Sequence, residues 1–441
     1  RAYEAVLEGT PLPEGVNHSL MGFIPKGEEE SDRGTVARTP GSTRPISLSN
    51  TVSKFFALAV NRPLAQVAAL TVHPRQRGFV AGRSLLDNVI EVEGYAQAYT
   101  ISDAADPAIL LFDIAAAFPS LAHQWLFVVL RRMKVPRFMI MCIQELYRDC
   151  FAEMVLLGQR WGRLPIRSGI RQGCPASGSL FVLAMDPCIR YLVSKMSPRR
   201  GILTAFADDL AAAVPELFPA LVILEKAFQV VARCSSLELH PGKVVVIPLW
   251  KYVESEVRAS IADVAPSLAT ALIQNFGKLL GFFVGPGAPD RQWSSIRLEL
   301  RMRSRFLASL GLAWSGVLPL FRSHVLPVAS HRAQLCPIPA SMFRTEESCM
   351  AIVTKTPFRA VPAKLFFQGK AYGLGMDVPD LKTLGKAATF RAAESSMVLM
   401  QVVREHARVR ASRYLTITPL PRQVPRAGAV GHSYRTRAAA M

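Results

Sequence analysis

The spacing of apolar residues predicts alternating helices and strands, most clearly between residues 51 and 290. Residues 51–70 are apolar at helical spacing, and a second helix is predicted from Ser84. The continuous apolar run "PAILLFDI" at 107–114 is typical of a buried strand that delivers a carboxylate to its end. The remaining predicted elements are two strands around an exposed loop at 17–50, helices at 120–150, 179–196 and 216–236, a hairpin at 156–178, and strands at 243–247 and 276–284.

Two adjacent aspartates, Asp208 and Asp209, lie between the apolar segments of "ILTAFADDLAAAV", which are predicted to be the strands of a hairpin. Aspartate is common in turns, so the pair alone is compatible with a turn or a cap. Together with Asp113, at the end of the apolar run, it supplies three hard oxygen ligands of the kind that Mg²⁺ prefers. Three carboxylates can hold two such ions roughly 3.5–4 Å apart, which is an arrangement suited to phosphoryl transfer.

The charge of the chain indicates a polyanionic partner. The formal net charge is +19 and the pI is about 10.0, so nucleic acid is the first candidate and an anionic membrane the second. The 7 cysteines are scattered without a CxxC pair, which argues against a disulfide framework or a zinc module and favours an intracellular location. No apolar run is long enough to span a membrane. Because the chain begins at Arg1, we expect a segment of a longer product.

The last third of the chain differs from the rest. Residues 291–332 contain seven arginines and one acid, Glu299, among apolar side chains. This pattern predicts a basic helical domain. Beyond residue 415 the chain is rich in arginine and contains Pro421 and Pro425, so we expect a basic, disordered tail at 416–441.

Seven motifs occur in an order that resembles a known family. They are "TRPISLSN" (43–50), "RQRGFVAGRSLLDN" (75–88), "LLFDIAAAFPSL" (110–121), "IRQGCPASGSLFVLAMD" (170–186), "AFADDL" (205–210), "LELHPGKVVVIP" (237–248) and "GKLLGFFVG" (277–285). Together they resemble the reverse transcriptase domain, most closely the non-LTR retrotransposon type. The resemblance covers roughly residues 17–290 and continues more loosely to about 390.

The resemblance implies an α+β right-hand polymerase with an antiparallel-sheet palm, fingers and a helical thumb. The expected divisions are an N-terminal extension and fingers at 1–110, a palm at 111–290 with a fingers-associated segment near 150–180, and a thumb at 291–415. The implied activity is RNA-directed DNA polymerisation, in which a primer 3′-hydroxyl is extended with dNTPs on an RNA template. The implied cofactor is a pair of Mg²⁺ ions, with Mn²⁺ as a substitute. Such a protein works within a longer polyprotein or a ribonucleoprotein, in the nucleus for a retrotransposon product.

The resemblance also assigns roles to individual residues. Asp113, Asp208 and Asp209 match the catalytic metal ligands, and Lys243 matches a general acid for the pyrophosphate leaving group. The positions that match nucleotide-binding residues are Lys26, Arg44, Phe118, Gln172 and Gly173. Leu280 and Gly281 match the primer grip. A ring at Phe118 would leave no space for a 2′-hydroxyl and so select deoxynucleotides.

The chain departs from the family pattern around Phe118. Relatives usually have Lys-Ala before this aromatic residue and an acid after it, whereas this chain has Ala116, Ala117 and Pro119. Two alternatives stay open. An RNA-dependent RNA polymerase would typically carry an acid in place of Phe118 and a Gly-Asp-Asp hairpin. A non-catalytic scaffold for nucleic acid fits the unusual "AAAFP", but not the presence of all three aspartates.

Overall fold

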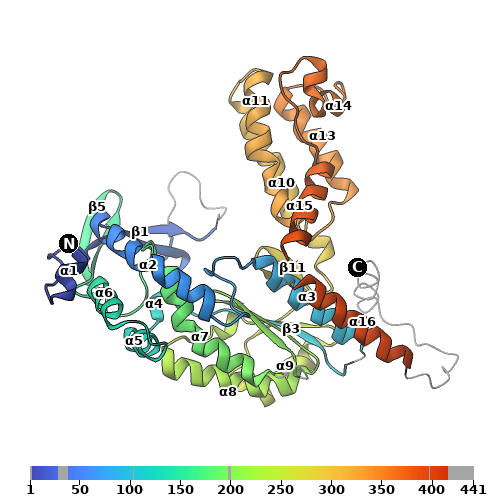
Figure 1. The fold of residues 1–441 in the computed structure, drawn as a ribbon. Helices are drawn as coiled ribbons and strands as arrows, with labels where there is room; N and C mark the ends of the chain where they lie inside the picture. The colour runs from blue at the N-terminus through green and yellow to red at the C-terminus, as the bar shows by residue number, and fades with distance from the viewer. Residues whose placement is uncertain (1, 28–37, 103, 197–199, 397, 416–441) are drawn as a thin grey trace.

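The computed structural model describes residues 2–27, 38–102, 104–196, 200–396 and 398–415. The tail expected at 416–441 lies outside the described residues. The fold is of the mixed α+β kind, with a five-stranded and a four-stranded sheet in the lower body of Figure 1 and a group of helices that projects away from them. No described helix is both long and apolar enough to cross a membrane.

The larger sheet has five strands in the order β6-β7-β3-β8-β9. Its strands are β3 (Ala108–Phe112), β6 (Ile202–Phe206), β7 (Asp209–Val214), β8 (Val245–Pro248) and β9 (Leu272–Ile273). All pairs are antiparallel except β8 and β9. The central strand, β3, is buried at every position, which agrees with the strand predicted from its continuous apolar run.

Helices cover both faces of this sheet, and this explains why β3 is apolar throughout. Successive side chains of a strand point to opposite faces. Ile109 and Leu111 therefore pack in a core shared with α3, while Leu110 and Phe112 pack in a second core shared with α7 and α8. The helices are α3 (Leu85–Ile101), α7 (Ser177–Lys195), α8 (Leu217–Ser235) and, beside α8, α9 (Glu254–Val264).

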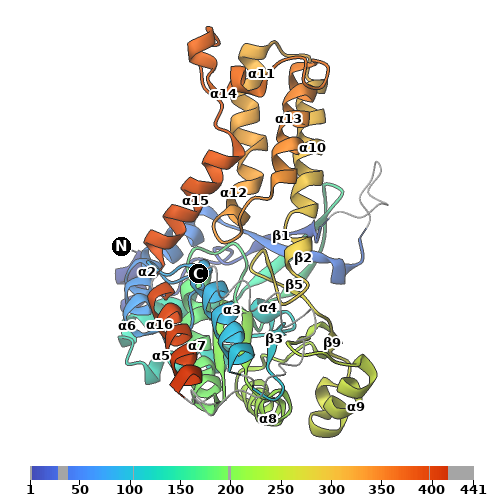
Figure 2. The same cartoon turned by 90° about the vertical axis from the view of Figure 1, so that its right-hand side faces the viewer.

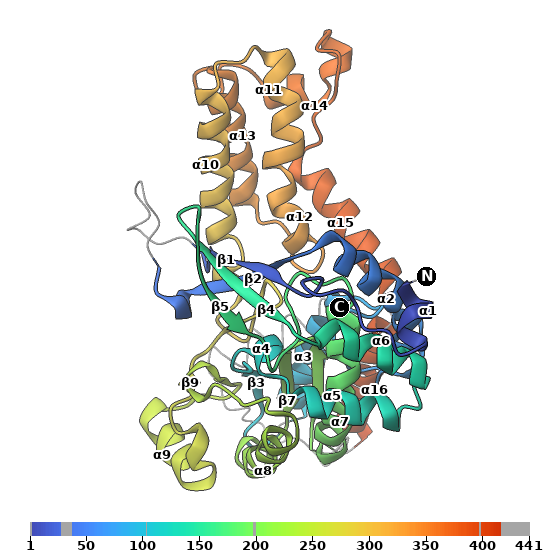
Figure 3. The same ribbon diagram turned by 90° about the vertical axis from the view of Figure 1, so that its left-hand side faces the viewer.

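A smaller sheet combines the N-terminal strands with a later hairpin, in the order β2-β1-β4-β5. The strands are β1 (Ser19–Pro25), β2 (Thr43–Ser49), β4 (Phe151–Leu156) and β5 (Gln159–Pro165). The hairpin predicted at 156–178 is formed by β4 and β5 and begins earlier, at Phe151. Its turn is formed by Leu157 and Gly158, which both have positive φ. The nearby helices are α1 (Ala2–Leu7), α2 (Thr51–Thr71), α4 (Ala117–Ser120), α5 (His123–Arg132) and α6 (Arg137–Tyr147); Figure 3 shows this side of the molecule.

The C-terminal third is helical, as the arginine-rich pattern predicted, and its helices from Ser294 to Ser395 form the projecting group of Figure 1. It follows a short hairpin, β10 (Gly277–Leu279) and β11 (Phe282–Val284). Its helices are α10 (Ser294–Ser309), α11 (Trp314–Leu320), α12 (Pro327–Ala333), α13 (Ala340–Thr354), α14 (Ala363–Phe367) and α15 (Leu381–Ser395).

The last helix, α16 (Leu399–Leu415), turns back and packs along α3, so the end of the described chain touches the main body (Figure 2). The two helices approach closely at Gly94, where a Cβ would lie 2.3 Å from Cγ1 of Val402. His406 Nε2 is 2.6 Å from the Gly94 carbonyl oxygen.

Candidate active site

The three aspartates meet at one edge of the five-stranded sheet. Asp113 directly follows β3, and Asp209 is the first residue of β7. Because Phe112 pairs with Leu210 in the antiparallel ladder, the ladder brings these two aspartates to the same edge. Asp208 lies in the two-residue turn between β6 and β7, whose first residue, Ala207, has φ +55°.

Burial, together with the charge of Asp113, raises the pKa of both aspartates of the β6–β7 hairpin. Burial raises the pKa of Asp209 to about 6, and the negative charges of Asp208 and Asp113 contribute in the same direction. Burial also raises the pKa of Asp208, and the negative charge of Asp113 raises it further. A backbone hydrogen bond and the positive charge of Arg44 act in the opposite direction. Carboxylate oxygens are the ligands that Mg²⁺ prefers, so the chemistry of these three side chains fits the metal implied by the sequence.

As placed in the described part of the chain, the three carboxylates do not form a ligand set for one metal ion. Residues there include no group of three or more His, Cys, Asp or Glu side chains placed to hold one metal ion. Asp113 is paired with Lys243 instead, and its Oδ2 lies 3.1 Å from the lysine Nζ. The Lys243 ammonium therefore supplies a positive charge at the carboxylates.

A cleft of about 360 Å³ opens beside this edge, lined by Asp113, Asp209 and Lys243 and by the β10–β11 turn. The turn residues Leu280 and Gly281 have φ +49° and +90°. The His331 ring lies 3.1 Å from the Leu280 carbonyl oxygen, and Arg332 Nε donates to that of Gly281 at 3.1 Å. At φ +90°, Gly281 has a backbone conformation that favours glycine, and a Cβ there would also lie 2.8 Å from His331 Nε2.

A second cavity, of about 540 Å³, contains Phe118, Gln172 and Gly173 in its lining. The Phe118 ring is stacked on Phe181, with centroids 4.3 Å apart and planes at 12°, and meets the edge of Phe79 at 5.9 Å. The two neighbouring rings therefore hold Phe118 in a fixed orientation.

The loop at 172–173 docks on β2. Ser47 N donates to the Gln172 carbonyl oxygen at 2.9 Å. Gly173 has φ +104°, and a Cβ there would lie 2.6 Å from the Ser47 carbonyl oxygen. The structure thus brings Phe118, Gln172 and Gly173 into one cavity.

The two basic residues expected to bind nucleotide differ in their placement. Both are exposed and belong to the four-stranded sheet: Arg44 lies in β2, and Lys26 directly follows β1. The positive charge of Arg44 acts on Asp208, so this arginine lies on the side of the carboxylates. Lys26 Nζ instead donates to the carbonyl oxygen of Gly41 at 2.9 Å, within its own loop.

Several residues that support this site were not singled out from the sequence as site residues. Phe79 and Phe181 hold the Phe118 ring, and His331 and Arg332 hold the β10–β11 turn. Phe79 and Phe181 lie in "RGFVAGRS" and "GSLFVLAMD", which are parts of the family motifs, so the sequence did mark their neighbourhood. His331 and Arg332 are 51 residues from the turn they contact, and no local pattern marks them.

Comparison with known proteins identifies the class of protein that this fold and site represent. The profile of the family described as "Reverse transcriptase (RNA-dependent DNA polymerase)" matches residues 24–258, just over half of the chain. The chain therefore belongs to the reverse transcriptase family, which confirms the resemblance seen in its motifs.

Similar proteins come from retrotransposons. The chain is 28% identical over 242 residues to the transposon TX1 uncharacterized 149 kDa protein of Xenopus laevis, covering 53% of this chain and 18% of that protein. It is 29% identical over 223 residues to the retrovirus-related Pol polyprotein from type-2 retrotransposable element R2DM of Drosophila melanogaster, covering 49% and 20%. The chain is thus distantly related to non-LTR retrotransposon proteins, and it spans about a fifth of their length.

Solved structures of similar outline are telomerases. The apo telomerase of Candida tropicalis matches with a TM-score of 0.46 and 11% identity, covering 96% of this chain and 70% of that one. A Candida albicans telomerase with a fragment of telomeric RNA matches with a TM-score of 0.45 and 10% identity, covering 94% and 68%. At these scores the likeness carries no argument about this chain.

Proposed function

We propose that the chain is an RNA-directed DNA polymerase that extends a primer 3′-hydroxyl with dNTPs on an RNA template. The observation that carries the proposal is the meeting of Asp113, Asp208 and Asp209 at one sheet edge, beside the cleft that Asp113 and Asp209 line. Family membership supports this reaction class, and the net charge of +19 suits a nucleic-acid substrate. The similarity to Pol polyproteins supports a place within a longer product.

We propose a right-hand arrangement for the described elements. The five-stranded sheet with its helices would be the palm, the four-stranded sheet and α2 the fingers, and α10–α15 the thumb. The parallel pairing of β4 with β1 supports assigning the segment near 150–180 to the fingers. Because α3 packs on the five-stranded sheet and α16 packs on α3, we assign both helices to the palm although they lie outside residues 111–290.

Divalent cations, held by Asp113, Asp208 and Asp209, would neutralise charge on the attacking and leaving oxygens during phosphoryl transfer. The ion pair between Lys243 and Asp113 supports this site, since it places a positive charge beside one of the carboxylates. We further propose that Lys243 donates a proton to the pyrophosphate leaving group. For this step its ammonium has to leave Asp113.

The second cavity is the proposed binding site for the sugar and base of the incoming nucleotide. The fixed ring of Phe118 would exclude a 2′-hydroxyl, while Gln172 and Gly173 would contact the nascent pair. Arg44, on the side of the carboxylates, would bind the triphosphate through a bidentate fork. Lys26 would join it only after releasing the Gly41 carbonyl oxygen.

The Leu280–Gly281 turn is the proposed primer grip. Its position in the lining of the cleft beside Asp113 and Asp209 supports this role. Since α12 fixes the turn through His331 and Arg332, the proposed thumb and the primer 3′ end would be mechanically linked.

The test is primer extension with the purified chain, a DNA primer annealed to an RNA template, and Mg²⁺. Reactions with dNTPs should extend the primer, and parallel reactions with NTPs should not. Extension with NTPs alone would instead establish an RNA polymerase. A chain that binds the primer–template in a mobility-shift assay but extends with neither substrate would be the non-catalytic scaffold favoured by the "AAAFP" sequence.

A further inference from the structure

A buried glutamine, Gln76, holds the turn between β6 and β7 from outside the hairpin. Gln76 is 0% exposed. Its Oε1 accepts from the Ala207 N–H at 2.8 Å and from the Gly78 N–H at 2.9 Å, while its Nε2 donates to the Ala207 carbonyl oxygen at 3.0 Å. One side chain thus satisfies both backbone polar groups of the residue that precedes Asp208.

The backbone around Gln76 reinforces this clamp. Ala205 N donates to the Arg75 carbonyl oxygen, and Arg77 N donates to that of Ala205, both at 2.9 Å, so residues 75–77 lie beside β6 in parallel. A Cβ on Gly78 would lie 2.1 Å from the Ala207 nitrogen. Only glycine permits this approach of two backbones.

The turn has a physical need for such a clamp. Ala207 has φ +55°, a left-handed conformation that costs an L-residue of order 1–2 kcal/mol. Its side chain and backbone are buried, with 4% exposure, so without Gln76 its N–H and C=O would lack these partners. An unsatisfied buried polar group costs about 1–3 kcal/mol, so the turn would move to regain partners. Asp208 would move with it.

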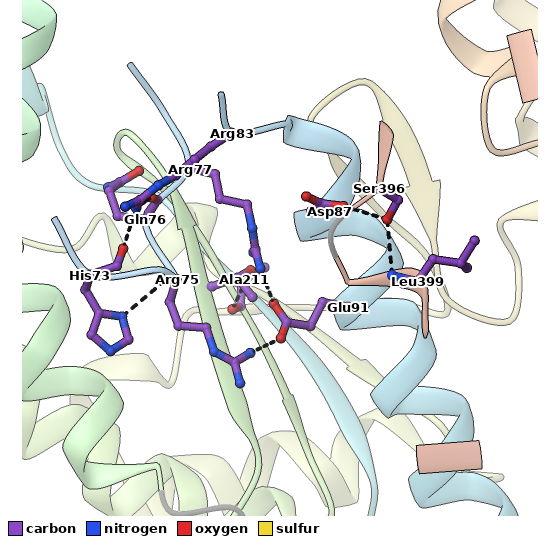
Figure 4. Close-up of polar contacts among 11 residues, drawn as sticks. His73, Arg75, Gln76, Arg77, Arg83, Asp87, Glu91, Ala211, Ser396 and Leu399 are labelled. Atoms are coloured by element: carbon purple, nitrogen blue, oxygen red, sulfur yellow. Dashed lines mark hydrogen bonds and ion pairs between the residues drawn. The ribbon is translucent and has the colours of Figure 1, made fainter. Parts of the chain in front are cut away.

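The clamp is itself anchored to α3. Arg75 and Arg77 both donate to the carboxylate of Glu91, which is 2% exposed, and the Arg77 contact measures 2.8 Å. Figure 4 shows the two arginines converging on Glu91 from the loop. Arg83 donates to the Gln76 carbonyl oxygen at 2.6 Å. Moving the loop would break a buried ion pair, and leaving a buried charge unpaired is costly.

We infer that Gln76 is a positioning residue, which fixes the Ala207 backbone and thereby the direction in which Asp208 presents its carboxylate. This role rests on the proposed polymerase function. The hydrogen bonds of the Gln76 side chain go to the Ala207 backbone and to Gly78, and Gln76 is not among the residues that line the two cavities, so it acts through the turn.

The test compares Gln76→Met with Gln97→Met. Both substitutions keep volume and remove a buried amide, but Gln97, on α3 and 2% exposed, makes no hydrogen bond to the turn. Gln76→Met should lower kcat for dNTP incorporation by roughly 10–100-fold while KM changes less than about 3-fold, since alignment is lost and nucleotide contacts remain. Gln97→Met should leave both near the wild-type values.

Two readouts are independent of polymerase activity. Amide hydrogen exchange in peptides covering 203–212 should be at least about tenfold faster in Gln76→Met than in Gln97→Met, because the turn opens more readily. Mn²⁺ binding to the nucleic-acid-free chain, followed by electron paramagnetic resonance, should be weaker in Gln76→Met alone. If Gln76→Met does not fold, Gln76→Asn, which is one methylene too short to reach Ala207, replaces it.

The outcomes separate the positioning role from the proposed function. Equal exchange of the turn and equal Mn²⁺ binding in the two methionine variants would overturn the role of Gln76, whether or not the wild type extends primers. A wild-type chain without extension activity, together with selective loss of turn protection and Mn²⁺ binding in Gln76→Met, would refute the polymerase and leave the clamp standing.

Discussion

Replacing Phe118 by alanine should weaken discrimination against ribonucleotides. In the structure this ring packs against two others: it is stacked on Phe181 at 4.3 Å and meets Phe79 at 5.9 Å. A ring held in this way forms a rigid wall for the proposed sugar site. Alanine removes the wall and leaves space for a 2′-hydroxyl.

The structure sets the scale of two effects. Truncating a fully buried phenylalanine costs about 3–5 kcal/mol, and Phe118 is half-buried, so we expect roughly 2 kcal/mol lower unfolding free energy. The ratio of kcat/KM for dNTP over NTP should fall about 10–100-fold, equivalent to roughly 1.4–2.7 kcal/mol of lost discrimination. Phe118→Tyr keeps the ring and should keep the preference for dNTPs.

The assay is single-nucleotide incorporation on an RNA template, with matched dNTP and NTP concentration series for the wild type, Phe118→Ala and Phe118→Tyr. Unfolding in urea gives the stability change for each variant. If Phe118→Ala folds and its dNTP preference stays within about threefold of wild type, the ring does not select the sugar.

Three further changes test other parts of the structure. Burial, with help from Asp380 and Glu347, raises the pKa of Glu346 from its ordinary value of 4.5 to about 8, so the folded chain binds this proton more tightly than the unfolded chain does. The stabilising contribution of Glu346 is complete below about pH 4.5 and is lost as the pH rises through 8. Glu346→Gln should flatten this decline and raise the unfolding free energy by roughly 2–5 kcal/mol at pH 9, measured by urea unfolding. If the unfolding free energies of the variant and the wild type follow parallel pH profiles, the prediction is wrong. Gly173→Ala puts a Cβ 2.6 Å from the Ser47 carbonyl oxygen at φ +104°, so KM for dNTPs should rise at least about fivefold in steady-state kinetics, and an unchanged KM would separate this loop from nucleotide binding. His406→Ala removes the contact with the Gly94 carbonyl oxygen and should cost about 1–2 kcal/mol, with faster hydrogen exchange in α16; unchanged exchange there would show that His406 does not hold the helix.

Local pattern predicted the elements that carry the aspartates. The apolar run before Asp113 is the central strand β3, and the segments around Asp208 and Asp209 are the β6–β7 hairpin. A strand buried on both faces is apolar throughout, which makes it easy to recognise. The ordered motifs then gave the family, which the profile match confirms.

The supporting contacts could not be predicted, since they join residues far apart in the chain. The Gln76 side chain reaches Ala207 across 131 positions, and the Gly94 carbonyl oxygen meets His406 across 312. Nor does sequence pattern show that Asp113 forms an ion pair with Lys243. Such pairs depend on how the sheet brings separate loops together.

The carboxylate at Asp208 is the most direct point at which to test the polymerase. Single-turnover incorporation of one dNTP on an RNA template with Mg²⁺ is measured for the wild type, Asp208→Asn and Asp263→Asn, an exposed position on α9 that serves as the matched control. We predict full activity in the wild type and the control, and a loss of activity of at least about 10³-fold in Asp208→Asn. The melting temperature of Asp208→Asn should not fall, because the substitution removes a half-buried carboxylate that Asp113 repels. Wild-type incorporation by a folded Asp208→Asn chain would contradict the account.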